Sequence, residues 1–261
     1  MRQEDRLGLI LERLNARGTV GVTDLAAELG VSVASVRRDL QLLEDQHLLS
    51  RTHGGAVSSG VLYELPMRYR GGRNQEEKRL VAHAAAALVT DGVRSVALSG
   101  GTTTTEVARV LATRSGLKVV TNAINIASEL APRPQISLVV CGGTARPESH
   151  ELVGPIAELT LARLNVDIAF VGVDGISAAA GLTTHHEVEA ATNRAMIHTA
   201  ARVVVVADGS KIGQRAFAQI AALDQISDLI TAGAADPDEC RRIQDAGVRV
   251  VVVGPGSGSE G

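Results

Sequence analysis

The order of apolar and polar positions divides the chain into two regions with different periods. In the first region, leucine and isoleucine recur every three or four residues over 4–16, which predicts a helix with one buried face. Val36, Leu40 and Leu43 repeat this spacing in a second predicted helix. From residue 93 onward, short runs rich in valine and isoleucine alternate with helical stretches. This alternation predicts a mostly parallel sheet covered by helices.

A further short helix and a tight turn precede Val36. We expect Thr23 to cap a helix over 24–29, Gly30 to end it, and Ser32 to cap the helix that contains Val36. Two helices joined in this way predict a helix-turn-helix, whose second helix enters the major groove in DNA-binding proteins. Many helical hairpins with a glycine turn do not bind DNA, so the spacing alone leaves both interpretations open.

The polar side of the helix after Ser32 carries hydroxyl groups and arginines, and arginine forks bind guanine and phosphate. Residues 48–57 predict a small β wing with a Gly54-Gly55 turn, which places two more basic side chains against the DNA backbone. Residues 1–57 hold seven arginines and eight acids, so binding depends on where the arginines point and should be strongly salt-dependent. The predicted DNA-contacting residues are Ser32, Ser35, Arg37, Arg38, Gln41, Arg51 and His53.

The segment 31–56, VSVASVRRDLQLLEDQHLLSRTHGGA, resembles the DNA-binding signature of the DeoR family of bacterial transcription regulators. The residues from Ser35 to Leu40 form the centre of the match, and the wing forms its end. Ser35 stands where the family usually has threonine and keeps the hydroxyl group. The resemblance implies double-stranded operator DNA as a partner. In such a fold we expect Asp39 to brace an arginine or a helix cap, because phosphate would repel its charge.

Composition sets the outer bounds. A chain of 261 residues with 45% hydrophobic residues is long enough for two domains. No apolar run approaches a membrane span and the N-terminus is charged, so we expect a cytoplasmic protein without a membrane partner. Aromatic residues make up 2%, which argues against single-strand stacking platforms and favours duplex DNA. The expected parts are a winged helix-turn-helix DNA-binding domain (1–57), a linker (58–73), an α/β effector-sensing domain (74–253) and a flexible tail (254–261).

The second region predicts a doubly wound α/β domain with a ligand crevice. In open α/β sheets the carboxyl ends of the strands form that crevice. Polar and glycine-rich segments follow five of the predicted strands, so we expect them to converge on one site. The predicted effector-binding residues are Gly100, Gly101, Thr102, Thr103, Thr104, Thr105, Asn122, Gly142, Gly143, Asp174, Gly175 and Lys211.

The chemistry of these segments favours a phosphorylated ligand. Gly100 and Gly101 let backbone amides approach closely, the threonines add hydroxyl groups, and a helix predicted over 106–113 points its N-terminus at the site. Glycine in such a turn can also serve shape alone. The segment is neither a Walker loop nor a GxGxxG turn, so we expect no nucleotide cofactor. Lys211, one of only three lysines, can pair with a phosphate group.

Other polar residues near the predicted strand ends have less defined roles. The stretch 183–187 (TTHHE) offers hydrogen bonds to sugar hydroxyls. We expect no metal site, because the adjacent His185 and His186 point in different directions. The two cysteines, Cys141 and Cys240, lie far apart in sequence, so we expect reduced, packed thiols.

This second region resembles the sensor domain of the same family, which is similar in fold to ribose-5-phosphate isomerase. The matching segments are 100–105 (GGTTTT), 119–122 (VVTN), 141–144 (CGGT), 167–176 (DIAFVGVDGI), 181–184 (GLTT) and 205–213 (VVADGSKIG). The resemblance implies a repressor that releases DNA when a phosphorylated sugar or a related metabolite binds. Ser99 and Ala232 stand where aspartate is usual in the family, and both departures bear on which ligand binds.

The competing interpretation is an enzyme, because a sugar-phosphate site is half of an isomerase. Proton transfer between carbons needs a base, and Asp174, Glu187 and Asp208 are candidates. A free-standing isomerase has no use for arginines on an exposed helix, so we expect a regulator and not an enzyme. Activator and repressor both remain open. We expect a homo-oligomer, a dimer or tetramer, that presents its recognition helices to repeated half-sites.

Overall fold

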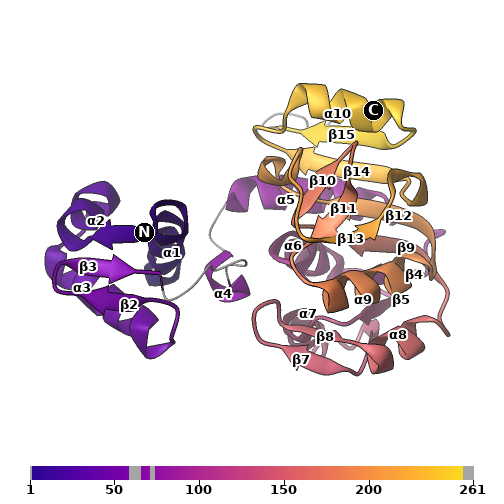
Figure 1. Ribbon diagram of the computed structural model, residues 1–261. Coiled ribbons are helices and arrows are strands. Elements are labelled where there is room, and N and C mark those ends of the chain that lie inside the picture. The colour runs from indigo at the N-terminus through magenta and orange to yellow at the C-terminus, as the bar shows by residue number, and fades with distance from the viewer. Residues whose placement is uncertain (1, 59–65, 71–73, 255–261) are drawn as a thin grey trace. The chain divides into compact units, whose positions relative to one another are not determined.

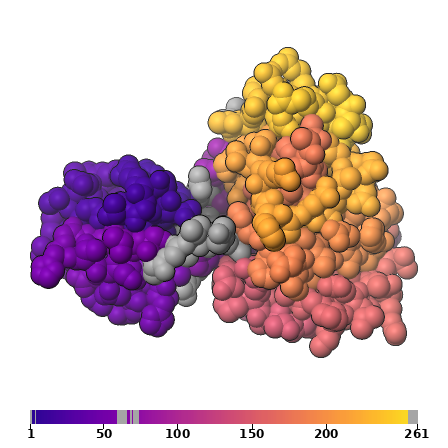
Figure 2. Space-filling view, viewed as in Figure 1, coloured from indigo at the N-terminus to yellow at the C-terminus, as the bar shows by residue number. Residues whose placement is uncertain are grey.

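The computed structural model describes residues 2–58, 66–70 and 74–254. The chain divides into two compact units, and the division falls between Arg73 and Asn74 (Figure 1). Figure 2 shows the same units in space-filling form. The predicted tail beyond Gly254 and most of the predicted linker lie outside the described residues.

The first unit is a three-helix core with a small antiparallel sheet in the order β1-β3-β2. Its elements are α1 (Gln3–Arg17), β1 (Thr19–Gly21), α2 (Val22–Leu29), α3 (Val33–Asp45), β2 (Ser50–Thr52) and β3 (Gly55–Val57). The predicted apolar stripe is confirmed, because Val36, Leu40 and Leu43 on α3 are fully buried in the core of this unit. The predicted wing is confirmed as β2 and β3, and β1 is an additional strand that joins them.

The glycine turn ahead of α3 has the expected geometry, but the start of α2 does not. Gly30 adopts the left-handed conformation with φ 64°, and Ser32 Oγ accepts a hydrogen bond of 3.1 Å from the Ser35 amide. The prediction that Thr23 caps α2 is wrong, since the helix begins at Val22 and has no side-chain cap. The Val22 amide instead donates to the Gly54 carbonyl in the wing at 2.8 Å. A contact distant in sequence thus replaces the local cap.

Part of the predicted linker packs on the first unit. Met67–Arg70 forms the short helix α4, and Tyr69 is buried in the same core as α1. The Tyr69 hydroxyl donates to the Gln46 side chain. A Cβ at Gly8 would lie 2.4 Å from the Tyr69 carbonyl oxygen, so only glycine on α1 permits this approach. The segments 59–65 and 71–73 lie outside the described residues.

The second unit contains a sheet of seven parallel strands, counted over residues 74–254, in the order β15-β14-β12-β9-β4-β5-β6. Each corresponds to one of the predicted runs, which confirms the expected doubly wound α/β fold. The strands are β4 (Ser95–Leu98), β5 (Leu117–Thr121), β6 (Ile136–Val140), β9 (Val166–Val171), β12 (Ala200–Val206), β14 (Asp228–Ala232) and β15 (Arg249–Val253).

Two apolar cores cover the two faces of this sheet. Helices α5, α6 and α7 contribute to one core, and α8, α9 and α10 contribute to the other. These helices are α5 (Gln75–Ala87), α6 (Thr102–Leu111), α7 (Ile124–Leu130), α8 (Pro155–Leu161), α9 (Glu187–Ile197) and α10 (Pro237–Asp245). Cys141 and Cys240 are buried free thiols, and burial raises the pKa of Cys141 to about 11. No helix in the described residues is long and apolar enough to cross a membrane.

The strand order reverses between β4 and β9. From β4 the chain adds β5 and β6 on one side, and then β9, β12, β14 and β15 on the other. In doubly wound sheets ligands bind at the carboxyl ends of the strands beside such a reversal. The fold therefore places the crevice next to the residues that follow β4 and β9.

Several short antiparallel strands lie outside the central sheet, and the sequence did not predict them. They are the hairpin β7 (Thr144–Arg146) and β8 (Glu151–Val153), and the sheet of β10 (Gly175–Ser177), β11 (Gly181–Thr184) and β13 (Ala218–Ala221). Two 3-10 turns, Gly209–Lys211 and Leu223–Gln225, complete the elements. The hairpin and β11 carry acidic and hydroxyl side chains into the site.

Candidate functional site

The exposed side of α3 carries two arginines that form no ion pair in the part of the chain that the structure describes. Arg37 and Arg38 are exposed, and so are Ser32 and Gln41. The Ser32 and Ser35 hydroxyl groups lie 3.0 Å apart at the start of the helix. A phosphate or a base edge can therefore reach both guanidinium groups without displacing an internal carboxylate.

Two other residues predicted to contact DNA, Arg51 and Gln41, are hydrogen-bonded to each other. The Arg51 guanidinium of β2 donates to the Gln41 side-chain oxygen, and the Gln41 amide nitrogen donates to Asp45 at 2.9 Å. The Arg51 backbone amide donates to Glu44 at 2.9 Å, which ties the wing to α3. His53 is exposed in the turn of the wing.

Asp39 faces inward and anchors α3 to α1. Its carboxylate accepts from Arg6 Nε at 2.5 Å, from Arg6 Nη2 at 3.0 Å and from the Gln3 side chain at 3.2 Å. The Asp39 side chain is 1% exposed. This bidentate pair fixes the helix that presents Arg37 and Arg38, and it confirms that Asp39 braces an arginine.

In the second unit, α6 begins at Thr102, four residues before its predicted start. The threonine run is therefore the first turn of the helix and not a loop. Thr104 and Thr105 donate their hydroxyl groups to the Gly101 carbonyl at 2.9 and 2.7 Å, so these hydroxyls are not free for a ligand. The amides of residues 101–104 have no acceptor among the described residues, which leaves the N-terminus of α6 open to an anion.

The Gly100 amide is already occupied. It donates to Glu151 Oε1 at 2.8 Å, and the Asn122 side chain donates to the same oxygen at 3.3 Å. Burial, together with the negative charge of Glu189, raises the pKa of Glu151 to about 8. Glu151 was not predictable as a site residue, because it lies 51 residues from Gly100 on an unpredicted hairpin.

A chain of polar contacts continues from Glu189 to Lys211. Arg146 Nη1 lies 2.6 Å from Glu189 Oε1, and Thr184 Oγ1 lies 3.1 Å from the other oxygen of that carboxylate. Thr184 also donates to Asp174 Oδ2 at 3.0 Å, and Lys211 Nζ lies 3.6 Å from Asp174 Oδ1. The structure thus brings Asp174 and Lys211 together, while Arg146 and Glu189 are residues that the sequence did not suggest.

Asp208 lies beside this chain and connects it to the start of the unit. It accepts from Ser210 Oγ at 2.5 Å and from the Asn74 side chain at 3.1 Å, and Lys78 Nζ lies 3.9 Å away. Burial raises the pKa of Asp208, but the Ser210 hydrogen bond and the Lys78 charge lower it more, so the net pKa is depressed. Asn74 stands at the start of α5, but its side chain binds Asp208 and does not cap the helix.

The remaining predicted glycines have packing roles in the structure. A Cβ at Gly143, where φ is 143°, would lie 2.7 Å from the Val153 carbonyl oxygen. A Cβ at Gly175 would lie 2.4 Å from the Gln214 carbonyl oxygen, whereas Gly142 is exposed. The close backbone contacts at Gly143 and Gly175 account for glycine there without a ligand.

The two departures from the family pattern are both buried. Ser99 Oγ accepts from the Gly172 amide at 3.0 Å and donates to the Gly100 carbonyl at 3.1 Å. It therefore joins the ends of β4 and β9. Ala232 is fully buried at the end of β14.

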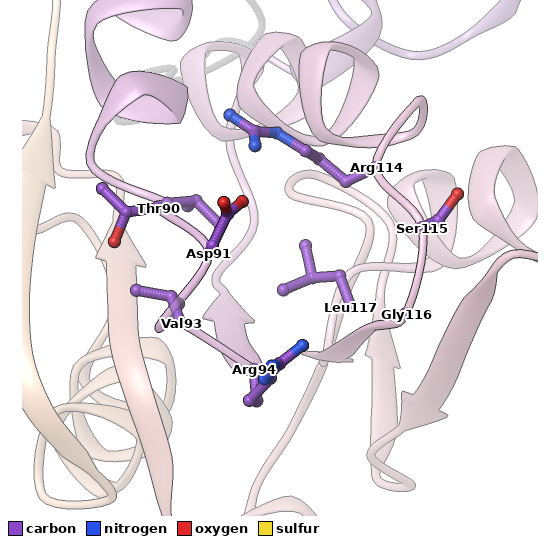
Figure 3. Close-up of a pocket in the computed structure, with 9 residues that line it drawn as sticks. Thr90, Asp91, Val93, Arg94, Arg114, Ser115, Gly116 and Leu117 are labelled. Atoms are coloured by element: carbon purple, nitrogen blue, oxygen red, sulfur yellow. The ribbon is translucent and has the colours of Figure 1, made fainter.

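A separate cavity of about 280 Å³ opens at the amino edge of the sheet (Figure 3). It lies where the chain enters β4 and β5, so it is at the edge opposite to the crevice. Its lining residues are Val89, Thr90, Asp91, Val93, Arg94, Arg114, Ser115, Gly116 and Leu117. None of the predicted site residues lines this cavity.

A winged helix-turn-helix followed by a doubly wound α/β domain is the architecture of ligand-responsive transcription regulators. Residues 6–60 match the model of the DeoR-like helix-turn-helix domain, and residues 73–232 match that of the DeoR C terminal sensor domain. The chain is 39% identical over 248 residues to the HTH-type transcriptional regulator GlpR of Haloferax volcanii, covering 95% of this chain and 96% of that protein. This chain belongs to the DeoR family of transcription regulators.

Two further comparisons name proteins that are similar to this chain. The glycerol-3-phosphate regulon repressor of Escherichia coli K12 is 29% identical over 231 residues, covering 88% of this chain and 91% of that protein. Among solved structures, a D-ribose-5-phosphate isomerase in complex with phospho-erythronic acid is 16% identical with a TM-score of 0.40, covering 52% of this chain and 53% of that one.

Proposed function

We propose that this regulator is a repressor of a carbohydrate or related metabolic operon, released from its operator by a phosphorylated sugar or a similar phosphorylated metabolite. The observation that carries the proposal is the open N-terminus of α6 at the strand reversal, at the same edge of the sheet as the Asp174–Lys211 pair. The name of the glycerol-3-phosphate regulon repressor supports a phosphorylated effector. An activator with the same two sites is the alternative, and transcription assays with and without effector separate the two.

On the DNA side, α3 supplies the contacts. We assign base or phosphate contacts to Arg37 and Arg38, with Ser35 beside them at the start of the helix. Ser32 also holds the helix cap, and Gln41 and Arg51 exchange their mutual hydrogen bond for contacts with DNA. His53 of the wing faces the backbone.

On the effector side, the phosphate group binds the first-turn amides of α6, and Lys211 exchanges Asp174 for the phosphate. Asn122, Asp174 and Thr184 then face the hydroxyl groups of the sugar. No cofactor or metal takes part in this proposal. The site holds a ligand and does not turn it over, since Asp174 and Asp208 are held by lysines and Glu187 has a side chain 69% exposed.

The signal passes from the crevice to the segment that leads to the DNA-binding unit. Lys211 lies three residues after Asp208, and Asp208 holds Asn74, the first residue of the second unit. A ligand that draws Lys211 away from Asp174 therefore acts next to the contact that fixes the start of α5. We propose a homo-oligomer, a dimer or tetramer, working in the cytoplasm where the operator lies.

The test is a thermal-shift screen of the full chain against a panel of phosphorylated sugars and polyols, with the non-phosphorylated compounds as controls. One phosphorylated compound should raise the melting temperature, because a ligand that binds only the folded state stabilises it. At the same ligand concentration Lys211→Ala should lose most of this shift, and Lys118→Ala, which removes an exposed lysine on β5, should keep it. Equal shifts in both variants would contradict the assigned site.

A further inference from the structure

Glu151 differs from the other acids of the crevice in its partners. Asp174, Glu189 and Asp208 pair with Lys211, Arg146 and Lys78, respectively. Glu151 is buried, with only 4% of its surface exposed. No lysine or arginine among the described residues forms an ion pair with it. Its carboxyl group is instead held by a backbone amide and a side-chain amide.

The position of this carboxyl group coincides with the loop that begins the anion site. A Cβ built on Gly100 would lie 2.5 Å from Glu151 Cδ and 2.7 Å from Oε1. The carboxyl group therefore rests directly on Gly100, one residue before the free amides of 101–104. Glycine at this position is what makes room for it.

A backbone amide has one hydrogen, so when it donates a linear hydrogen bond to Glu151 it cannot donate an equally strong one to a second anion. A carboxyl oxygen and a phosphate oxygen can both accept the hydrogen bond of the same backbone amide, so they compete for it. We propose that Glu151 is an internal competitor for the anionic group of the effector, so that a ligand gains the Gly100 amide only when Glu151 leaves it. The proposal rests on the proposed function, because it requires an anion at the start of α6.

Displacement of Glu151 involves the hairpin that carries it. The Leu152 amide donates to the Asn122 carbonyl at 2.7 Å, and Glu151 forms a β-bridge with Ala123. These contacts fix β8 against the end of β5. A ligand that expels Glu151 therefore loosens the backbone of the β7–β8 hairpin.

The protonation of Glu151 adjusts the strength of the competition. The groups that face it are Glu189 from α9, with its partner Arg146 from β7, and the amides of Gly100 and Asn122 from the ends of β4 and β5. Burial raises the pKa of Glu151 to about 8. Near pH 7 the carboxyl group is mostly neutral, and above pH 8 it becomes an anion that binds Gly100 more tightly and repels a ligand of the same sign.

The experiment measures sulfate binding to the full chain by calorimetry, because sulfate stays a dianion between about pH 6.5 and 9.5. The site-specific part is the binding that Lys211→Ala removes. Glu151→Ala should bind sulfate roughly tenfold more tightly than the wild type, the value of one charge-assisted hydrogen bond. Asp224→Ala removes an exposed acid of the 3-10 turn Leu223–Gln225 that forms no ion pair among the described residues, and it should match the wild type.

A second variant covers the case in which Glu151→Ala fails to fold. Glu151→Gln keeps an acceptor oxygen for Gly100 but cannot ionise. Wild-type affinity for sulfate should fall as pH rises through 8, and the affinity of Glu151→Gln should stay level. Hydrogen exchange of the hairpin should also increase when sulfate binds.

Two failures are distinguishable. If the wild type binds sulfate through Lys211 but Glu151→Ala binds equally or more weakly, the competitor role is wrong and the anion site stands. If neither the wild type nor Glu151→Ala shows binding that depends on Lys211, the anion site of the proposed function is wrong and the competitor role falls with it.

Discussion

The two regions assigned to recognition differ in how their positive charges are held. On α3, Arg37 and Arg38 are exposed and form no ion pair among the described residues. In the crevice, Arg146 lies 2.6 Å from Glu189 and Lys211 lies 3.6 Å from Asp174. The DNA-facing surface can therefore accept phosphate directly, whereas the crevice is neutralised from within. An effector must exchange partners, which suits a signal that changes the structure.

The largest expected effect is the loss of operator affinity when the unpaired arginines of α3 are removed. Arg37→Ala with Arg38→Ala should weaken operator binding by about 4 kcal/mol, roughly a thousandfold, because each good guanidinium contact contributes about 2 kcal/mol. Fluorescence anisotropy on operator DNA measures this loss, and effector affinity should not change. Arg133→Ala with Arg163→Ala removes two exposed arginines of the second unit and should leave DNA affinity nearly unaltered. An equal loss in both pairs would mean that only net charge matters.

The next effect concerns what holds α3 in place. Asp39→Asn should lower the free energy of unfolding of the first unit by about 3 kcal/mol, because it leaves the Arg6 guanidinium without its buried partner. Urea denaturation monitored by circular dichroism measures this change. Asp24→Asn, at an exposed position on α2, is the matched control. A change below about 0.5 kcal/mol for Asp39→Asn would show that the pair is not needed to hold the helix.

A substitution in the crevice, where the positive charges are already paired, should have a smaller effect on binding. Lys211→Ala should weaken effector binding by about 2 kcal/mol, roughly thirtyfold, since a charge-assisted contact with phosphate is lost while the α6 amides remain. Isothermal titration with the compound found in the screen measures it, with Lys118→Ala as the control. DNA binding in the absence of effector should be retained. Its loss in Lys211→Ala would indicate a structural role for this lysine.

The smallest expected effect is the helix cap. Ser32→Ala removes the side-chain acceptor for the Ser35 amide and should destabilise the first unit by about 1 kcal/mol. Thermal unfolding measures the change. If operator affinity falls by much more than the change in stability explains, Ser32 also contacts DNA directly.

The sequence predicted the periodic parts of this fold because those signals are local. The stripe of Val36, Leu40 and Leu43 and the seven apolar runs are visible within short windows. Gly30 and Ser32 were recognisable for the same reason. The start of α2 was not, because the Val22 amide is satisfied by Gly54, a residue of the wing.

The crevice shows the limit of local reasoning more clearly. The strand ends correctly brought Asp174 and Lys211 to one place, as the parallel topology requires. Local patterns do not show that the hydroxyl groups of Thr104 and Thr105 donate to Gly101 inside the first turn of α6. Glu151 was missed, since a three-residue strand has no periodicity to detect. Its role follows only from the contact with Gly100.

The central claim is that binding of an anionic effector in the crevice lowers the affinity of α3 for operator DNA. The most direct measurement is the fluorescence anisotropy of the full chain on the DNA upstream of its own gene, at near-physiological salt, titrated with the phosphorylated compound found in the screen. The account predicts tight, sequence-selective binding that this compound releases in the wild type, and in Lys211→Ala only at a roughly thirtyfold higher concentration. Release of Lys211→Ala at the wild-type concentration, or the absence of selective DNA binding under every condition, would contradict it.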